Sequence, residues 1–188
     1  MKTDRTIQAA IGAALLALVP ATQAQDATAA PANLIKNGDM ETIAAEWPAN
    51  WPKPKEGGSL EEEKGNHFIR LKSPEPDKMI LLYHQIPIPA GTKKIELKWK
   101  QRASDLKAGT EAWFDARVML EFRNDEKQKV GKAPSAPYVR KDTAGWEERS
   151  VTAEVPEGAT WFVFMPSLFR VASGTLDIDD FSLTVVEP

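Results

Sequence analysis

The chain has no cysteine and only two histidines among its 188 residues. Without cysteine there is neither a disulfide framework nor a thiol nucleophile, so an exported form must be held by its core or by a metal ion. His67 and His84 lack the spacing of an HExxH zinc motif. The sequence also lacks a GxSxG elbow and a glycine-rich phosphate loop. These absences weigh against the common thiol, zinc, serine and nucleotide chemistries.

The chain also lacks any concentration of charge of one sign. Lysine and arginine total 24 and aspartate and glutamate total 27, for a net charge of −3. Charges of both signs are scattered along the chain, which is typical of a solvated surface and not of the basic stripe that binds nucleic acid. We therefore expect no nucleic-acid partner.

No apolar run is long enough to span a membrane. The longest run, residues 9–19, is well short of the roughly 20 residues that a spanning helix needs. It follows Lys2 and Arg5 and precedes the small-residue segment Thr22-Gln23-Ala24, which is the pattern of a cleaved export signal. We predict a signal peptide at 1–24, a flexible leader at 25–32 and one domain at 33–188, secreted or periplasmic. An uncleaved membrane anchor is the alternative.

From residue 66 onward, apolar and polar residues alternate in short runs separated by Pro, Gly, Asp and Asn. This period of two indicates half-buried strands. The clearest strand is 93–101, where Ile95, Leu97 and Trp99 share one face. Further strands are predicted at 67–72, 79–86, 112–123, 148–155, 161–166 and 175–186. Because helical periodicity is hard to find, the sequence predicts an all-β fold, a β-sandwich or jelly roll.

Three segments then suggest a family. They are NLIKNGDME at 33–41, Gly145-Trp146 followed by a strand and VPEGA at 155–159, and GTLDIDDFSL at 174–183. In order and spacing they resemble the carbohydrate-binding modules of the 4/9/22 type, over nearly all of the mature chain. That resemblance implies a galactose-binding-like jelly roll, a structural calcium ion, and a polysaccharide such as a β-glucan or xylan held across one sheet.

The resemblance implies that Glu41 and Asp180 hold the calcium, because they match the positions that do so in the family. Calcium takes about six to eight oxygen ligands, and a sandwich can bring its chain ends together to supply them. The alternative is an ordinary Asn37-Gly38 turn and a solvated strand end at Asp179-Asp180.

Sugars are bound by exposed aromatic rings and polar side chains. Two groups of residues are candidates, one in the Pro-rich segment 46–58 and one on predicted strands. In the segment, Trp47 and Trp51 serve equally well as glycan-stacking rings or as a plug that closes the sandwich. On the strands, the candidates are Tyr83, Gln85, Trp113, Arg117 and Glu121.

The strand candidates lie on predicted outward faces. On 112–123, Val118, Leu120 and Phe122 are expected to point inward and Arg117 and Glu121 outward. Tyr83 and Gln85 share one face of 79–86. If the sheet face is concave, these side chains could form a binding site; if it is convex, they form an ordinary solvated surface. The rings of Trp99, Trp146 and Trp161 are assigned to packing.

Two other classes of function remain. Glycoside hydrolysis needs two carboxylates, and Glu111, Asp115 and Glu121 lie on or beside one strand. A cell-surface protein-interaction module would need an exposed apolar patch, for which Met79–Leu82 is the candidate, although a buried strand explains that run better. The sequence favours a non-catalytic polysaccharide-binding module, expected to be a monomer.

Overall fold

A computed structural model describes residues 31–135 and 137–186. The predicted signal peptide and most of the predicted leader lie outside these residues. The described part is all β, which confirms the predicted fold class. In this part of the chain no helix is long and apolar enough to cross a membrane.

The described residues form twelve strands, and all their pairings are antiparallel. The strands are β1 Ile43–Ala44, β2 Trp47–Pro48, β3 Gly58–Glu63, β4 Asn66–Lys72, β5 Met79–Leu81, β6 His84–Pro87, β7 Lys94–Lys107, β8 Ala116–Arg123, β9 Tyr138–Val139, β10 Glu147–Glu154, β11 Trp161–Phe169 and β12 Ser173–Val185.

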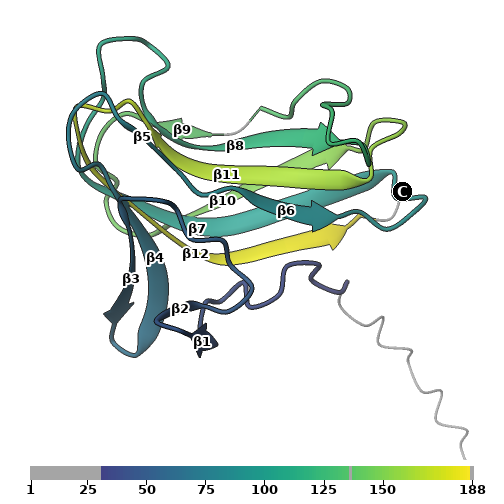
Figure 1. Cartoon of the computed structure of the whole chain (residues 1–188), viewed down its shortest axis with the longest axis horizontal. Coiled ribbons are helices and arrows are strands. Elements are labelled where there is room, and N and C mark those ends of the chain that lie inside the picture. The colour runs from purple at the N-terminus through teal and green to yellow at the C-terminus, as the bar shows by residue number, and fades with distance from the viewer. Residues whose placement is uncertain (1–30, 136, 187–188) are drawn as a thin grey trace, which may run out of the picture. The chain divides into compact units, whose positions relative to one another are not determined.

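Two sheets make up the sandwich (Figure 1). The first sheet has the order β10-β7-β12-β4-β3, and the second has the order β5-β11-β8-β9 with β6 also paired to β11. Strands β1 and β2 form a separate small hairpin. The predicted strand at 79–86 is interrupted, because β5 ends at Leu81 and β6 begins at His84.

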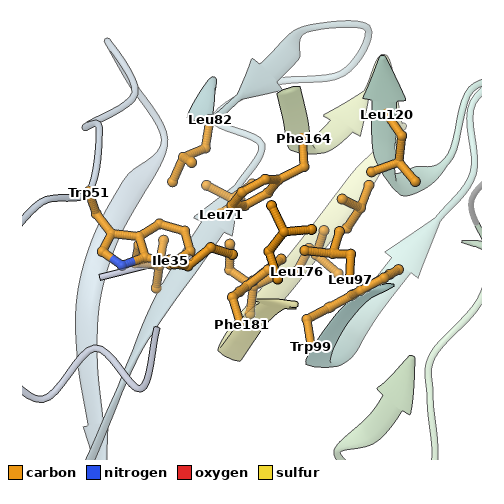
Figure 2. Close-up of a cluster of buried hydrophobic side chains, with 14 of the residues drawn as sticks. Ile35, Trp51, Leu71, Leu82, Leu97, Trp99, Leu120, Phe164, Leu176 and Phe181 are labelled. Atoms are coloured by element: carbon orange, nitrogen blue, oxygen red, sulfur yellow. The ribbon is translucent and has the colours of Figure 1, made fainter. Parts of the chain in front are cut away.

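The core lies between the two sheets. Inward residues of the first sheet, such as Leu97 and Leu176, belong to the same buried cluster as Leu120 and Phe164 of the second sheet (Figure 2). Along β7 every second side chain is buried through residue 103, as the alternation predicts. Val118, Leu120 and Phe122 are also buried, which confirms their predicted inward direction. The fold therefore leaves the alternate residues of each sheet on an outer face.

The two bracketing motifs of the sequence meet in space. The Phe181 N–H donates a hydrogen bond to the Gly38 carbonyl oxygen at 2.9 Å. The Asn33 side chain donates to the Phe181 oxygen at 3.1 Å and accepts from the Leu183 N–H at 2.9 Å. A side chain at Gly38 would place its Cβ 1.9 Å from the Phe181 oxygen, so this close approach requires glycine.

A β-bulge in β12 creates the docking point for this N-terminal segment. The register against β7 shifts between Asp179 and Ser182, and Asp180 adopts a left-handed φ of 51°. The extra residue changes the parity of the strand, so that both Ile178 and Phe181 point into the core. The consecutive aspartates of the DIDDF motif thus supply a backbone irregularity as well as negative charge.

Candidate functional site

Exposed aromatic rings gather on one side of the sandwich. Among the described residues, five large apolar side chains are exposed: Ile43, Met79, Tyr83, Trp113 and Tyr138. Tyr83, Trp113 and Tyr138 are 36%, 55% and 58% exposed. All three adjoin the second sheet: Tyr83 precedes β6 and contacts Gln85, Trp113 precedes β8, and Tyr138 lies on β9. Large aromatic rings bury much of their surface in most folds, so three exposed rings on one side make this surface the candidate site.

Strand register brings the polar candidates onto this same outer face. Gln85 of β6 and Glu121 of β8 both pair with Val163 of β11, so the three side chains point to the same side. Farther along, Arg117 of β8 pairs with Tyr138 of β9. The predicted shared face of Tyr83 and Gln85 is supported by a 3.5 Å contact between the Tyr83 hydroxyl and Gln85 Oε1.

The outer face is hollowed over β8 and β9. A cavity of about 540 Å³ lies there. The side chains that border it include Trp113, Arg117, Met119, Glu121, Lys129, Tyr138 and Met165. Its size falls in the range of small-ligand sites, roughly 300–1,000 Å³. The structure thus brings together Trp113, Arg117 and Glu121, which the sequence predicted on the outward face of the strand 112–123.

Each arginine on the outer face is paired with the carboxylate two residues before it. Arg117 donates to both oxygens of Asp115, at 2.5 and 2.6 Å, and the Asp115 side chain is fully buried. Arg123 donates to Glu121 Oε1 at 2.6 Å through Nε, and Lys129 Nζ lies 2.8 Å from Glu121 Oε2. Burial acts to raise the pKa of Glu121, but these two cations outweigh it and the pKa is lowered. The face therefore presents paired charges with fixed geometry.

The same arginines lie over the exposed tyrosines. The guanidinium carbon of Arg117 is 5.5 Å from the centre of the Tyr138 ring, and that of Arg123 is 5.5 Å from the centre of the Tyr83 ring. Such cation–π contacts contribute about 0.5–1 kcal/mol at exposed sites and limit the movement of the rings. Each tyrosine is thus held as a platform next to hydrogen-bonding groups.

Trp47 and Trp51 are not part of any exposed site. Each is only 6% exposed, so of the two predicted roles the structure shows the plug. The Trp51 ring stacks on His84 at 4.7 Å and donates from Nε1 to the Asn37 carbonyl oxygen at 2.7 Å. Figure 2 shows Trp51 pointing into the core cluster that contains Phe164 and Phe181. Trp51 takes this role because Phe164 and Phe181, distant in the sequence, pack against its ring.

The predicted calcium ligands are engaged in other contacts. Glu41 accepts from the His67 N–H at 2.7 Å and lies 2.8 Å from His67 Nδ1. Asp180 pairs with Lys100 at 2.9 Å. In residues 31–135 and 137–186 no three acidic, histidine or cysteine side chains form a group that could hold a metal ion. Next to them, Asp179 is 3% exposed, and burial raises its pKa to about 6.

The sequence missed Tyr138 and Lys129 as site residues. Tyr138 follows Pro137 in the long segment 130–145, which has neither strand nor helix periodicity in its sequence, and long loops often carry function. The sequence around Tyr138 thus has the same features as that around Trp47 and Trp51, namely an aromatic ring near proline in a segment without periodicity. Only the folded structure separates the exposed ring from the buried ones.

No family model and no curated protein matches the chain. Solved structures do match its fold, and the class that they define is the β-sandwich shared by carbohydrate-binding modules. This likeness, at low sequence identity, shows the fold. It does not decide whether the chain is of the 4/9/22 type.

Three of these structures illustrate the likeness. A family 16 carbohydrate-binding module has a TM-score of 0.54 and 17% identity, over 82% of this chain and 100% of that one. The CBM22-1 xylan-binding domain from Paenibacillus barcinonensis has a TM-score of 0.52 and 14% identity, over 85% and 97%. The enzymatically active domain of tailspike protein 4 from bacteriophage CBA120 has a TM-score of 0.61 and 12% identity, and the match covers 82% of this chain but only 21% of that one.

Proposed function

We propose that this protein binds polysaccharide without cleaving it, and that the outer face of the second sheet is its binding site. The observation that carries the proposal is the gathering of Tyr83, Trp113 and Tyr138 around that face, where a cavity is bordered by Trp113, Tyr138, Arg117 and Glu121. Flat rings stack on the C–H faces of sugars, and fixed carboxylate, guanidinium and amide groups bond to hydroxyls. The shared fold of carbohydrate-binding modules supports the same function.

The charges of the outer face favour an uncharged glycan. Arg117 is bound to Asp115, while Arg123 and Lys129 are bound to Glu121. An acidic polymer would have to compete with these carboxylates for the cations, whereas neutral hydroxyls can add to the paired groups without disrupting them. We therefore propose a neutral chain of the β-glucan or xylan type.

The carboxylates of this face are poorly arranged for glycoside hydrolysis. A general acid needs a raised pKa, yet the pKa of Glu121 is lowered by Arg123 and Lys129. Asp115 has no exposed side-chain surface, and both of its oxygens accept hydrogen bonds from Arg117. These contacts favour a binding role for the face over the hydrolase alternative. The interaction-module alternative has little support, since Ile80 and Leu82 of its candidate patch are buried.

Affinity gel electrophoresis tests the binding proposal. The wild-type protein should be retarded by barley β-glucan or soluble xylan and not by polygalacturonate. Tyr138→Ala and Trp113→Ala should each weaken retardation about tenfold, because each removes one stacking ring. Ile43→Ala is the matched control, since Ile43 is an exposed apolar residue on the β1–β2 hairpin, away from this face.

Three results would contradict the proposal. Unchanged retardation of both ring variants would remove the outer face as the site. Release of reducing ends from the same polysaccharides would favour the hydrolase alternative. An oligomer in a size measurement that ignores every glycan on an array would favour the protein-interaction alternative, because we propose a monomer.

We also propose a calcium ion at the meeting point of the two chain ends, with Glu41 and Asp180 among its ligands. The support is the buried Asp179 carboxylate, whose hydrogen-bond donors among residues 31–135 and 137–186 are both neutral, the Asn66 amide and the Asp180 N–H. Calcium would require Glu41 to release His67 and Asp180 to release Lys100. An excess of chelator should lower the melting temperature by several degrees, and calcium should restore it. An unchanged melting temperature would refute the ion.

To bind an extracellular polysaccharide, the protein must be exported. We propose export to the periplasm or the medium with cleavage after Ala24. N-terminal sequencing of the protein from the producing cell should begin at Gln25, and recovery of an intact Met1 terminus would contradict cleavage.

A further inference from the structure

A second, larger cavity lies at one end of the sandwich. Its volume is about 800 Å³, and its lining includes Asp77, Gly109, Glu111, Trp113, Phe114 and Arg170. These residues come from the segment after β4, the β7–β8 connection and the end of β11. We call it the end cavity. Of the residues that border it, only Trp113 also borders the cavity of the outer face.

The connection that carries Trp113 is a closed turn. The Phe114 N–H donates to the Glu111 oxygen at 3.1 Å, and the Gly109 N–H donates to the Phe114 oxygen at 2.9 Å. Arg140 reaches across and donates to the carbonyl oxygens of Glu111 and Ala112. A Cβ on Gly109 would lie 2.3 Å from the Arg170 oxygen, so glycine is needed for this wall. The turn thus holds the Trp113 ring, 55% exposed, where it borders both cavities.

A salt bridge also lines the end cavity, beside the turn that carries Trp113. Arg170 donates to both oxygens of Asp77, at 2.8 and 2.7 Å, and its guanidinium lies 4.4 Å from the centre of the Phe114 ring. Both members of the bridge have left-handed backbones, with φ of 67° for Asp77 and 51° for Arg170. A non-glycine residue in this conformation costs about 1 kcal/mol or more, so the surrounding structure holds this wall in place.

The charges of the end cavity define the chemistry of its ligand. Two carboxylates, Asp77 and Glu111, and one guanidinium, Arg170, line the cavity. Nε and Nη2 of Arg170 already donate hydrogen bonds to the two oxygens of Asp77. An anionic group would meet an excess of negative charge there. Carboxylates readily accept hydrogen bonds from hydroxyls, and the Trp113 ring offers a stacking surface. An uncharged sugar ring fits both features.

We propose that the end cavity is a second subsite for the same glycan that the outer face binds, and that Trp113 is shared by both subsites. This inference rests on the proposed function. It makes the ligand an extended neutral chain that passes over Trp113, with one segment on the outer face and a further sugar unit beside Glu111. The chain must therefore be longer than the outer face alone requires.

Titration calorimetry with oligosaccharides tests the inference. The probes are the cello-, xylo- and manno-oligosaccharide series from two to six sugars. In the series that binds, wild-type affinity should rise about tenfold once the chain is long enough to cross Trp113. Glu111→Ala should remove that gain and leave the affinity for the shortest binding member unchanged. Trp113→Ala should weaken binding at every length.

Glu157→Ala is the matched control, because Glu157 is an exposed carboxylate in the turn after β10 and borders neither cavity. Thermal melts of all variants check that they are folded. If Glu111→Ala binds every length as the wild type does, the second subsite is refuted while the proposed function stands. If it weakens all lengths equally, the two-subsite arrangement is also refuted. If no series binds the wild-type protein, the proposed function fails and this inference fails with it.

Discussion

A Cβ atom at Gly38 would lie 1.9 Å from the Phe181 oxygen, so the segment 33–41 can approach β12 this closely only with glycine at this position. The Phe181 N–H also donates to the Gly38 oxygen at 2.9 Å. Substitution must therefore push the segment away from β12. We predict that Gly38→Ala lowers the free energy of unfolding by at least about 2 kcal/mol, as measured by urea denaturation.

Gly65→Ala provides the comparison for this prediction. Gly65 has a φ of +81°, but nothing lies within 4 Å of its added Cβ. Its cost should be only about 1 kcal/mol, from the left-handed backbone. Equal losses in the two variants would mean that the contact with Phe181 is not what demands glycine at position 38.

The burial of Trp51 decides between the two roles that its Pro-rich surroundings left open. The ring packs edge-on against Phe164 and Phe181, at 6.0 and 5.3 Å between ring centres. Trp51→Ala should cost about 3–5 kcal/mol and lower the midpoint of chemical denaturation. Trp113→Ala removes a ring of the same kind that is 55% exposed, and it should leave the free energy of unfolding within about 0.5 kcal/mol of wild type. A Trp51→Ala protein as stable as wild type would contradict the plug.

At the level of elements, a single carboxylate joins three strands of the first sheet. Asp177 of β12 has no exposed side-chain surface and lies in register with Arg70 of β4 and Arg102 of β7. It accepts four hydrogen bonds from the two guanidinium groups, at 2.6 to 3.0 Å. If Asp177 lost its negative charge, the Arg70 and Arg102 guanidinium groups would lie side by side on the outer side of this sheet without that carboxylate to neutralise them.

We predict that Asp177→Asn lowers the free energy of unfolding by about 3 kcal/mol. Glu63→Gln tests the specificity of the effect, because Glu63 also pairs with Arg102, at 2.9 Å, but is solvent-exposed. That variant should lose less than about 1 kcal/mol. Similar losses in both, measured by urea denaturation, would show that the burial of Asp177 is not decisive.

The elements also show where sequence patterns succeed and where they fail. Strands β4, β7, β10 and β12 were predicted within a few residues of their ends, apart from the longer C-terminal end of β7. Their sequences alternate apolar and polar residues over much of their length, although the bulge in β12 interrupts this alternation. Strand β3 was missed, since GSLEEE has no such alternation and forms an edge strand through pairing with β4. The break between β5 and β6 was missed as well.

At the scale of the whole molecule, stability should depend on pH through His84. This residue is 7% exposed, and burial lowers its pKa from 6.5 to about 4. At pH values between these two pKa values, His84 binds a proton in the unfolded chain but not in the folded protein. The free energy of unfolding should therefore fall as the pH falls from about 6.5 to about 4, by about 3 kcal/mol in total, and should not change through His84 above that window.

His84→Gln isolates this contribution. Other groups titrate in the same range, and His67, whose pKa is raised mainly by its hydrogen bond with Glu41, acts with the opposite sign. The difference between the two proteins removes these shared effects. The measurement is urea denaturation of both from pH 4.5 to pH 7. Parallel curves for wild type and variant would show that His84 does not drive acid sensitivity.

The sequence by itself determined the all-β architecture, the inward faces of the long strands and the two end motifs, because these follow from local alternation and from short segments of fixed chemistry. Only the tertiary structure decided which rings are available to a ligand. Trp51 and Tyr138 both lie close to proline in segments without periodicity, yet the first is 6% and the second 58% exposed. The physical reason is that exposure depends on which distant residues cover a ring: Phe164 and Phe181 pack against Trp51, while Tyr138 lies at the rim of a sheet face beside Arg117.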